Sequence, residues 1–235
     1  MTTALAMETP GLSPLDALLD HLRPRDLPVR VDEVAERLAL RIAVKRLEGR
    51  DAELNENTRT ISLGADEHGS PHPDGFTSRQ RFSAAHEVAH WLARRWPHVM
   101  PDERRKEVQA NIVAGEILLP WEAVHGALQM AGGGSGLPSV VVRLSSRAWV
   151  SREAAARRLL GLIGDAHLAE YELVGLGAEL VWTTIAESRL KDASVLSYLS
   201  DETEAPGWEY LRLGRSRLLV ARRPTPLRTA EMAPR

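Results

Sequence analysis

Two histidines and one glutamate stand within five consecutive residues of this chain, as His86, Glu87 and His90. In a helix, residues four apart lie on one face, so the two imidazoles can bind a single metal ion. Glu87 lies next to that face, where its carboxylate can reach a water molecule on the metal instead of the metal itself. This spacing predicts a divalent-metal site of the metallopeptidase type, with zinc as the favoured metal.

A catalytic zinc takes three protein ligands and keeps one position open for water. The chain has no cysteine, so the ligands must come from His, Asp and Glu. Glu107 is the predicted third ligand, because Ala110 and Ala114 follow it on one helix face and small side chains let two helices approach closely. Asn111, one turn further on, is predicted to orient a ligand by a hydrogen bond.

Other acids and histidines remain as alternatives to these residues. Glu103 lies nearer the helix start and Glu116 falls off the Glu107 face, so both are less favoured as ligands. His125 is an alternative electrostatic partner for an oxyanion, although a surface position is favoured. The histidines predicted to be solvated or to follow a helix end are His68, His72 and His98.

The helix that must carry the first motif is predicted over residues 79–95. Thr77 or Ser78 can cap its start, and Pro97 ends it. A second helix, which must carry Glu107, is predicted from residue 102 to 119.

Hydrophobic periodicity and turn residues predict the remaining elements. They are a helix over 30–40, strands at 41–47 and 58–63, a loop at 64–78, a flexible connection at 131–139, and short helices at 139–147 and 152–163. The stretches GAELVWTTIA, SVLSYLS and WEYLRLG…RLLVARR within 176–222 are typical of strands. The predicted fold class is α+β, with a catalytic domain over 1–130, a helical segment over 131–167 and a small β-rich region over 168–235.

Bulk composition excludes several classes of partner. The 30 basic and 32 acidic side chains nearly cancel, which argues against a general binder of nucleic acid or membranes. No stretch approaches the roughly 20 apolar residues of a membrane span. The N-terminal stretch lacks the basic start and apolar run of a signal peptide, so a soluble, cytoplasmic protein is expected.

At RQRFSAAHEVAHWLA and EVQANIVAGEILLP the sequence resembles the IrrE/ImmA family of bacterial metallopeptidases. The family shows Arg-x-Arg-Phe-(Thr/Ser)-x-x-His-Glu-x-x-His, followed by Glu-x-x-x-Asn and an apolar run ending in Pro. The matching residues are Arg79, Arg81, Phe82, Ser83, His86, Glu87 and His90, then Glu107, Ala110, Asn111, Ala114, Leu118 and Pro120. The departures are Val113 for Phe, Gly115 for Ala and Leu119 for Met. The resemblance covers about residues 28–165.

The resemblance implies a zincin-like fold, with His86, His90 and Glu107 as ligands of Zn²⁺ and Glu87 as the general base. Mn²⁺ is an alternative metal in the cell. It also implies limited proteolysis of a helix-turn-helix transcriptional repressor, which derepresses stress-response, DNA-damage or mobile-element genes. The radiation-response member adds a helix-turn-helix-like piece and a GAF-like domain, for which the region 168–235 is short.

Two other functions remain open from the sequence. The segment 143–164 holds five arginines against the single acid Glu153, and Val150-Ser151 resembles the turn and cap before a recognition helix. The arginines predicted to contact DNA or the repressor are Arg152, Arg157 and Arg158, with Arg143 and Arg147 beside them. Docking or structural roles are favoured over DNA contact. The other alternative is a metal-sensing regulator with a degenerate peptidase fold.

Overall fold

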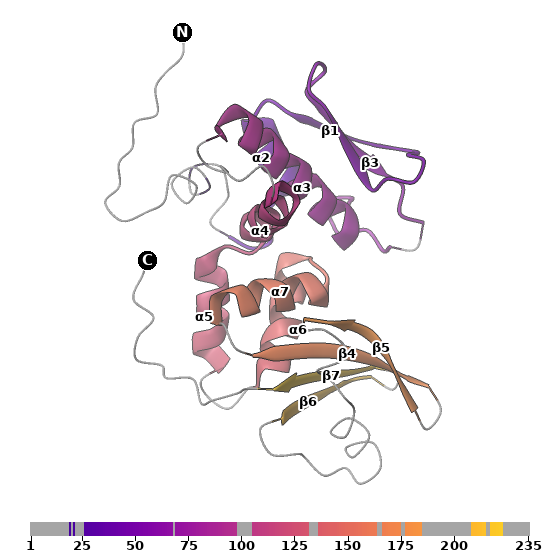
Figure 1. The fold of residues 1–235 in the computed structure, drawn as a ribbon, viewed down its shortest axis with the longest axis vertical. Helices are drawn as coiled ribbons and strands as arrows, with labels where there is room; N and C mark the ends of the chain where they lie inside the picture. The colour runs from indigo at the N-terminus through magenta and orange to yellow at the C-terminus, as the bar shows by residue number, and fades with distance from the viewer. Residues whose placement is uncertain are drawn as a thin grey trace, which may run out of the picture. The chain divides into compact units, whose positions relative to one another are not determined.

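The computed structural model describes residues 19, 21, 26–67, 69–97, 105–131, 136–163, 166–174, 177–184, 208–214 and 217–222. Over these residues it contains six helices and two β-sheets, which confirms the predicted mixed α+β class. Two compact units are present (Figure 1). The first unit holds the described residues up to Pro120 together with Ala148–Val150, and the second holds Trp121–Arg147 and the described residues from Ser151 onward.

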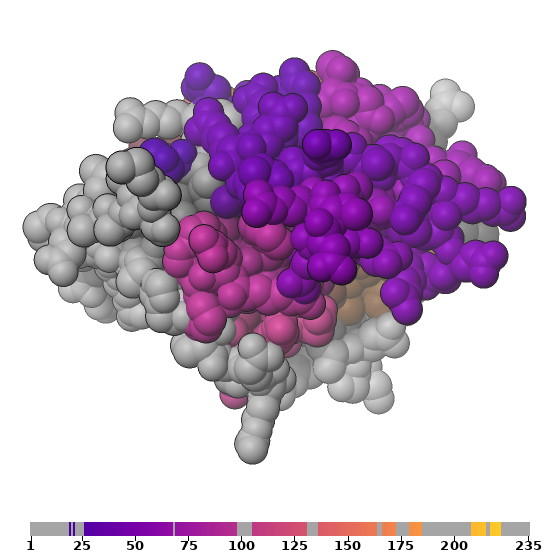
Figure 2. Space-filling view, turned by 90° about the horizontal axis from the view of Figure 1, so that it is seen from above, coloured from indigo at the N-terminus to yellow at the C-terminus, as the bar shows by residue number. Residues whose placement is uncertain are grey.

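The first unit is built on a three-stranded sheet with the order β1-β3-β2. The strands are β1 (Arg41–Lys45), β2 (Ala52–Asn55) and β3 (Thr60–Gly64). The central strand β3 pairs in parallel with β1 and antiparallel with β2. Its residues Ile61, Ser62 and Leu63 are buried. Strand β1 is exposed except at the half-buried Ile42, and β2 alternates between half-buried and exposed positions. Figure 2 shows the violet atoms of this part of the chain exposed over much of one face.

Helices α2 (Val31–Arg37) and α3 (Ser78–Arg95) pack in this unit, and α3 contacts both β2 and β3. Helix α3 begins at a capping box: Gln80 N donates to Thr77 Oγ1 at 3.2 Å, and Thr77 N donates to Gln80 Oε1 at 3.1 Å. Two backbone N–H groups at the helix start, which have no partner within the helix, thereby gain hydrogen bonds. The predicted helix start at Thr77 or Ser78 is confirmed.

Helix α4 (Lys106–Leu118) packs against α3. Its buried face includes Ala110 and Ala114, and the facing side of α3 buries Ala85 and Ala89. Alanine side chains at these positions keep the two backbones close, which short ligand side chains require if they are to meet. The predicted start of this helix, at residue 102, lies outside the described residues.

Strand β2 was not predicted from the sequence. It lies in the polar run DAELNENT, where only Ala52 and Leu54 are half-buried and Glu53 and Asn55 are exposed. Two weakly apolar positions are too few to reveal a strand by alternation, and an edge strand pairs on one side only. The strand exists because β3 offers it a hydrogen-bonding partner.

The second unit contains α5 (Trp121–Ala131), α6 (Leu137–Ala148, less its last residue) and α7 (Arg152–Ile163). Helices α6 and α7 confirm the two short helices predicted at 139–147 and 152–163. An antiparallel sheet follows, with the order β5-β4-β7-β6. Its strands are β4 (His167–Val174), β5 (Gly177–Thr183), β6 (Trp208–Leu213) and β7 (Arg217–Arg222). The strand predicted at SVLSYLS lies outside the described residues.

A buried carboxylate joins this sheet to α7. The Glu170 side chain on β4 is only 1% exposed and accepts hydrogen bonds from Arg152 at 2.9 and 2.5 Å, Arg217 at 3.0 Å and Trp182 Nε1 at 2.8 Å. Burial alone would raise the pKa of Glu170, but these hydrogen bonds and the two positive charges hold it below its ordinary value. Arg152 therefore has a structural role in the second unit.

None of the described helices combines the length and the apolar composition that crossing a membrane requires.

Candidate metal centre

Helices α3 and α4 bring His86, His90 and Glu107 together. The Nε2 atoms of His86 and His90 lie 2.9 Å apart. Glu107 places Oε2 3.2 Å from His86 Nε2 and Oε1 3.3 Å from His90 Nε2. One ligand atom from each residue lies within 4.8 Å of the other two. The imidazole rings are nearly perpendicular, at 78°, so their nitrogens converge without the rings stacking.

This donor set fits a zinc ion. Zinc binds imidazole nitrogen at about 2.0–2.1 Å and carboxylate oxygen at about 2.0–2.2 Å, so the ligand atoms of a tetrahedral site stand roughly 3.3 Å apart. The separations of 2.9 to 3.3 Å between the donor atoms lie close to that value. Two imidazole nitrogens and a carboxylate can therefore hold a metal ion here. The Glu107 side chain is 73% exposed, which leaves one side of the group open to solvent.

Asn111 lies beside His86, away from the other two donors. Its Oδ1 atom is 2.9 Å from His86 Nδ1. When the ring donates Nδ1–H to this carbonyl oxygen, the lone pair of Nε2 points toward His90 and Glu107. With Oδ1 as the acceptor, Asn111 favours the tautomer that a metal ligand needs.

Electrostatics keep the group ready for chemistry near neutral pH. Burial raises the pKa of Glu87; His86 opposes that effect, and the neighbouring Glu107 and Glu53 carboxylates reinforce it. Burial also lowers the pKa of His90; His86 acts in the same direction, and the Glu107 carboxylate acts against it. The shift of His90 favours the neutral imidazole that can bind a metal, and the shift of Glu87 favours its protonated form.

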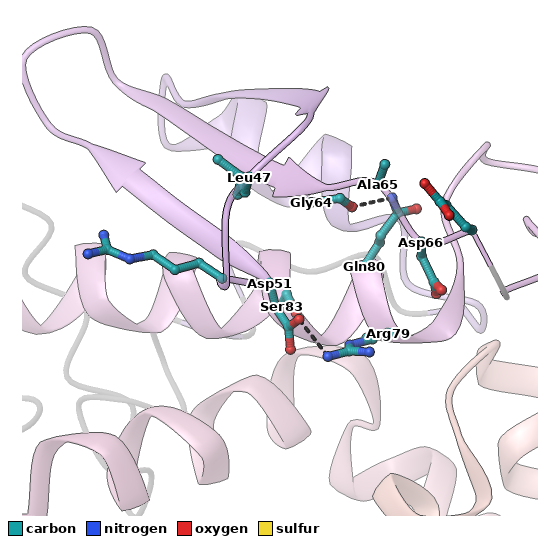
Figure 3. Close-up of a pocket in the computed structure, with 10 residues that line it drawn as sticks. Leu47, Asp51, Gly64, Ala65, Asp66, Arg79, Gln80 and Ser83 are labelled. Atoms are coloured by element: carbon teal, nitrogen blue, oxygen red, sulfur yellow. Dashed lines mark hydrogen bonds and ion pairs between the residues drawn. The ribbon is translucent and has the colours of Figure 1, made fainter.

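A cavity of about 240 Å³ borders the same helix one turn earlier (Figure 3). Arg79, Gln80 and Ser83 of α3 form one wall, and Leu47, Arg50, Asp51 and residues 64–67 form the other. Arg79 Nη2 lies 2.6 Å from Asp51 Oδ1, so this exposed ion pair links the two walls. Ser83 precedes His86 by three residues, about 4.5 Å along the helix axis. The cavity therefore begins one helical turn from the metal ligands.

An exposed apolar strip lies on α4 beside Glu107 and Asn111. Val108 is 57% exposed and Ile112 is 54% exposed. The two residues are four apart, so they form one continuous strip on the helix surface.

The other candidate residues have different surroundings. His72 donates to or accepts from Ser78 Oγ at 2.9 Å and stacks on Trp149, and it is not part of the metal group. His125 packs against Trp121 in the second unit. Arg157 pairs with Glu153 one turn earlier at 2.8 Å. Arg158 is half-buried on the same helix. The candidates His68, His98 and Glu103 lie outside the described residues.

Comparison with known protein families finds a match over part of the chain. Residues 76–160 match the model of a peptidase family whose description is the IrrE N-terminal-like domain. Over this range the chain is similar to an IrrE N-terminal-like domain. The resemblance to the IrrE/ImmA family is therefore confirmed, and the matched region runs from the start of α3 through most of α7.

A solved structure shares the fold of this chain. A Mycobacterium tuberculosis transcriptional regulator superposes with a TM-score of 0.52 at 12% sequence identity, over 88% of this chain and 74% of that one. At this identity the likeness concerns the fold alone. No curated protein sequence matches the chain.

Proposed function

We propose that the chain is a zinc-dependent endopeptidase with a zincin-like fold. Its metal ligands are His86, His90 and Glu107, and its general base is Glu87. The observation that carries this proposal is the convergence of three ligand atoms from α3 and α4. The IrrE N-terminal-like domain supports it, because that family is one of peptidases.

His86, His90 and Glu107 would hold the zinc ion, which would supply a Lewis acid for the scissile carbonyl and for water. Glu87 removes the proton from the attacking water and later donates it to the leaving amine. The raised pKa of Glu87 suits both steps, since the group must accept and release a proton within one reaction cycle. Asn111 holds the His86 ring in its binding orientation.

The surroundings of the ligands suit an extended polypeptide as the substrate. The cavity beside Ser83 can take a substrate side chain, and the strip of Val108 and Ile112 can bind an apolar one. Strand β2 is an edge strand of the order β1-β3-β2, and an edge strand can pair with an extended peptide. The cavity, the strip and strand β2 all belong to the unit that contains the three metal ligands.

We propose a helix-turn-helix transcriptional repressor as the substrate, cleaved once to derepress stress-response or mobile-element genes. This choice rests on the IrrE/ImmA resemblance. Such a substrate would place the reaction in the cytoplasm. Arg143 and Arg147 on α6 are available as a basic surface for docking the repressor.

Two substitutions separate metal binding from catalysis. Glu87→Gln should keep stoichiometric zinc but abolish cleavage of a repressor encoded beside the gene. His86→Ala should lose both the zinc and the cleavage. Zinc content is measured by atomic absorption and cleavage by gel electrophoresis. Full cleavage by the Glu87→Gln protein would show that another group acts as the base.

A DNA-binding regulator is the second candidate, because the solved neighbour is called a transcriptional regulator. The ion pairs of Arg152 with Glu170 and of Arg157 with Glu153 weigh against it, since they partly neutralise the side chains that would meet phosphate. Salt-dependent DNA binding that Arg143→Ala and Arg147→Ala abolish would favour this candidate. A metal-sensing regulator without peptidase activity would bind zinc and leave every repressor intact.

A further inference from the structure

The buried side chain of Arg81 ties the start of α3 to neighbouring segments. Arg81 is 0% exposed and forms an ion pair with Asp74, whose side chain is 1% exposed. Arg81 Nη2 also donates to the carbonyl oxygen of Val29 at 2.6 Å. Burial lowers the pKa of Arg81, and the Asp74 charge opposes this effect. A guanidinium held in this way is costly to leave unpaired.

The turn between α6 and α7 contacts the buried Arg81 side chain. The Arg81 guanidinium carbon lies 5.4 Å from the centroid of the Trp149 ring, and Arg81 Nη2 lies 3.4 Å from the Ala148 carbonyl oxygen. The other neighbour of the indole is His72, at 5.5 Å between ring centroids and an interplanar angle of 3°. His72 in turn hydrogen-bonds to Ser78 Oγ in the first turn of α3. Trp149 therefore reaches α3 through two separate residues.

The backbone at Trp149 supports a specific role. Its φ of 56° lies in the left-handed region, which is unfavourable for a bulky residue. Such a conformation persists where the surrounding contacts determine it. Ala148–Val150 also belongs to the first unit, although α6 and α7 on either side of it belong mainly to the second. The match to the IrrE-like domain extends past this turn, to residue 160.

We propose that Trp149 is a positioning residue for the metal ligands. By holding Arg81 and His72, it fixes the start of α3, and Arg81 stands five residues before His86, about 7.5 Å along the helix axis. A shift of α3 would carry His86 and His90 away from Glu107, which comes from a different helix. The unit that binds the metal is therefore complete only with the α6–α7 turn. This inference concerns the same site as the proposed function and rests on it.

The test compares two apolar replacements in the full chain. Trp149→Phe keeps an aromatic face for Arg81 and His72, whereas Trp149→Leu removes it. Trp149→Leu should weaken zinc affinity about tenfold and lower kcat by one to two orders of magnitude with KM unchanged, because small misplacements of reacting groups have effects of this size. Trp149→Phe should stay close to wild type. Zinc affinity is measured by competition with a chelator, under conditions where circular dichroism shows a folded chain.

A matched control separates positioning from general destabilisation. Trp182→Leu removes an indole from β5 in the second unit and should leave zinc affinity unchanged. Equal losses in Trp149→Leu and Trp182→Leu, or wild-type zinc affinity in Trp149→Leu, would overturn the proposal. If Trp149→Leu does not fold, His72→Ala carries the test and must show the same loss of zinc affinity.

The two proposals fail in different ways. A wild-type chain that binds zinc but cleaves no repressor contradicts the peptidase function, and the zinc-affinity comparison still decides the role of Trp149. A wild-type chain that binds no zinc contradicts both.

Discussion

Asn111 Oδ1 on α4 lies 2.9 Å from Nδ1 of His86 on α3. The contact joins two helices whose motifs are about 20 residues apart in the sequence, and it determines which imidazole nitrogen faces His90 and Glu107. The ligand cluster therefore depends on the pairing of α3 with α4 as well as on the spacing within α3.

Removing this contact should weaken metal binding without removing a ligand. Asn111→Ala leaves His86 free to rotate and to adopt the other tautomer, so zinc affinity should fall about 10- to 100-fold. Asn57→Ala, an exposed asparagine in the turn between β2 and β3, is the matched control. Chelator competition measures both variants. Unchanged affinity in Asn111→Ala would mean that the His86 orientation is set elsewhere.

The apolar strip on α4 should contribute to substrate binding. Val108→Ser combined with Ile112→Ser should raise KM roughly tenfold, since about 1.4 kcal/mol of lost apolar contact corresponds to that factor. The value of kcat and the zinc content should stay the same, because neither side chain is a ligand. Val44→Ser is the control, since Val44 on β1 is 51% exposed in the same unit. An equal rise of KM in the control would show that the strip makes no specific contribution to substrate binding.

The stability of the second unit should depend on the charge of Glu170. Its pKa is held below the ordinary value of about 4.3, so its stabilising effect is present above that pH and is lost as pH falls through the lowered pKa. Glu170→Gln should reduce the free energy of unfolding by about 1.5–3 kcal/mol at pH 7, because hydrogen bonds to a charged group are lost.

Urea unfolding at pH 7, 5 and 3 measures this effect. The difference between wild type and Glu170→Gln should shrink as the pH falls below the ordinary pKa of a glutamate toward the lowered pKa of Glu170. Glu172→Gln on the same strand, where the carboxylate is 48% exposed, should show a much smaller difference. A gap between wild type and Glu170→Gln that stays constant down to pH 3 would contradict the assigned charge.

The sequence predicts α3 well because its determinants are local. The capping residues Thr77 and Gln80, the apolar face and the His-Glu-x-x-His spacing all lie within one helix. Glu107 was chosen from the small residues around it on α4, and the structure places it beside both histidines. Local patterns in the sequence do not reveal pairing between distant strands. Strand β2 forms because it pairs with β3, and β4 likewise lies between β5 and β7.

The buried group around Arg81 also lies beyond local patterns. A signal was present, because Arg81 occupies the same helix face as the buried Ala84, Ala85 and Val88, and a charge on such a face requires a partner. The partners themselves come from three separate segments: Asp74 lies seven residues away, whereas Val29 and residues 148–149 are distant in the sequence. No periodicity in the sequence connects these segments.

Anomalous diffraction at the zinc absorption edge, recorded from crystals of the zinc-loaded chain, tests the central claim most directly. The account predicts one ion bound by Nε2 of His86, Nε2 of His90 and the Glu107 carboxylate, with a solvent molecule completing the coordination. A strong zinc peak elsewhere, or an ion at the two histidines with Glu107 turned away, would contradict it.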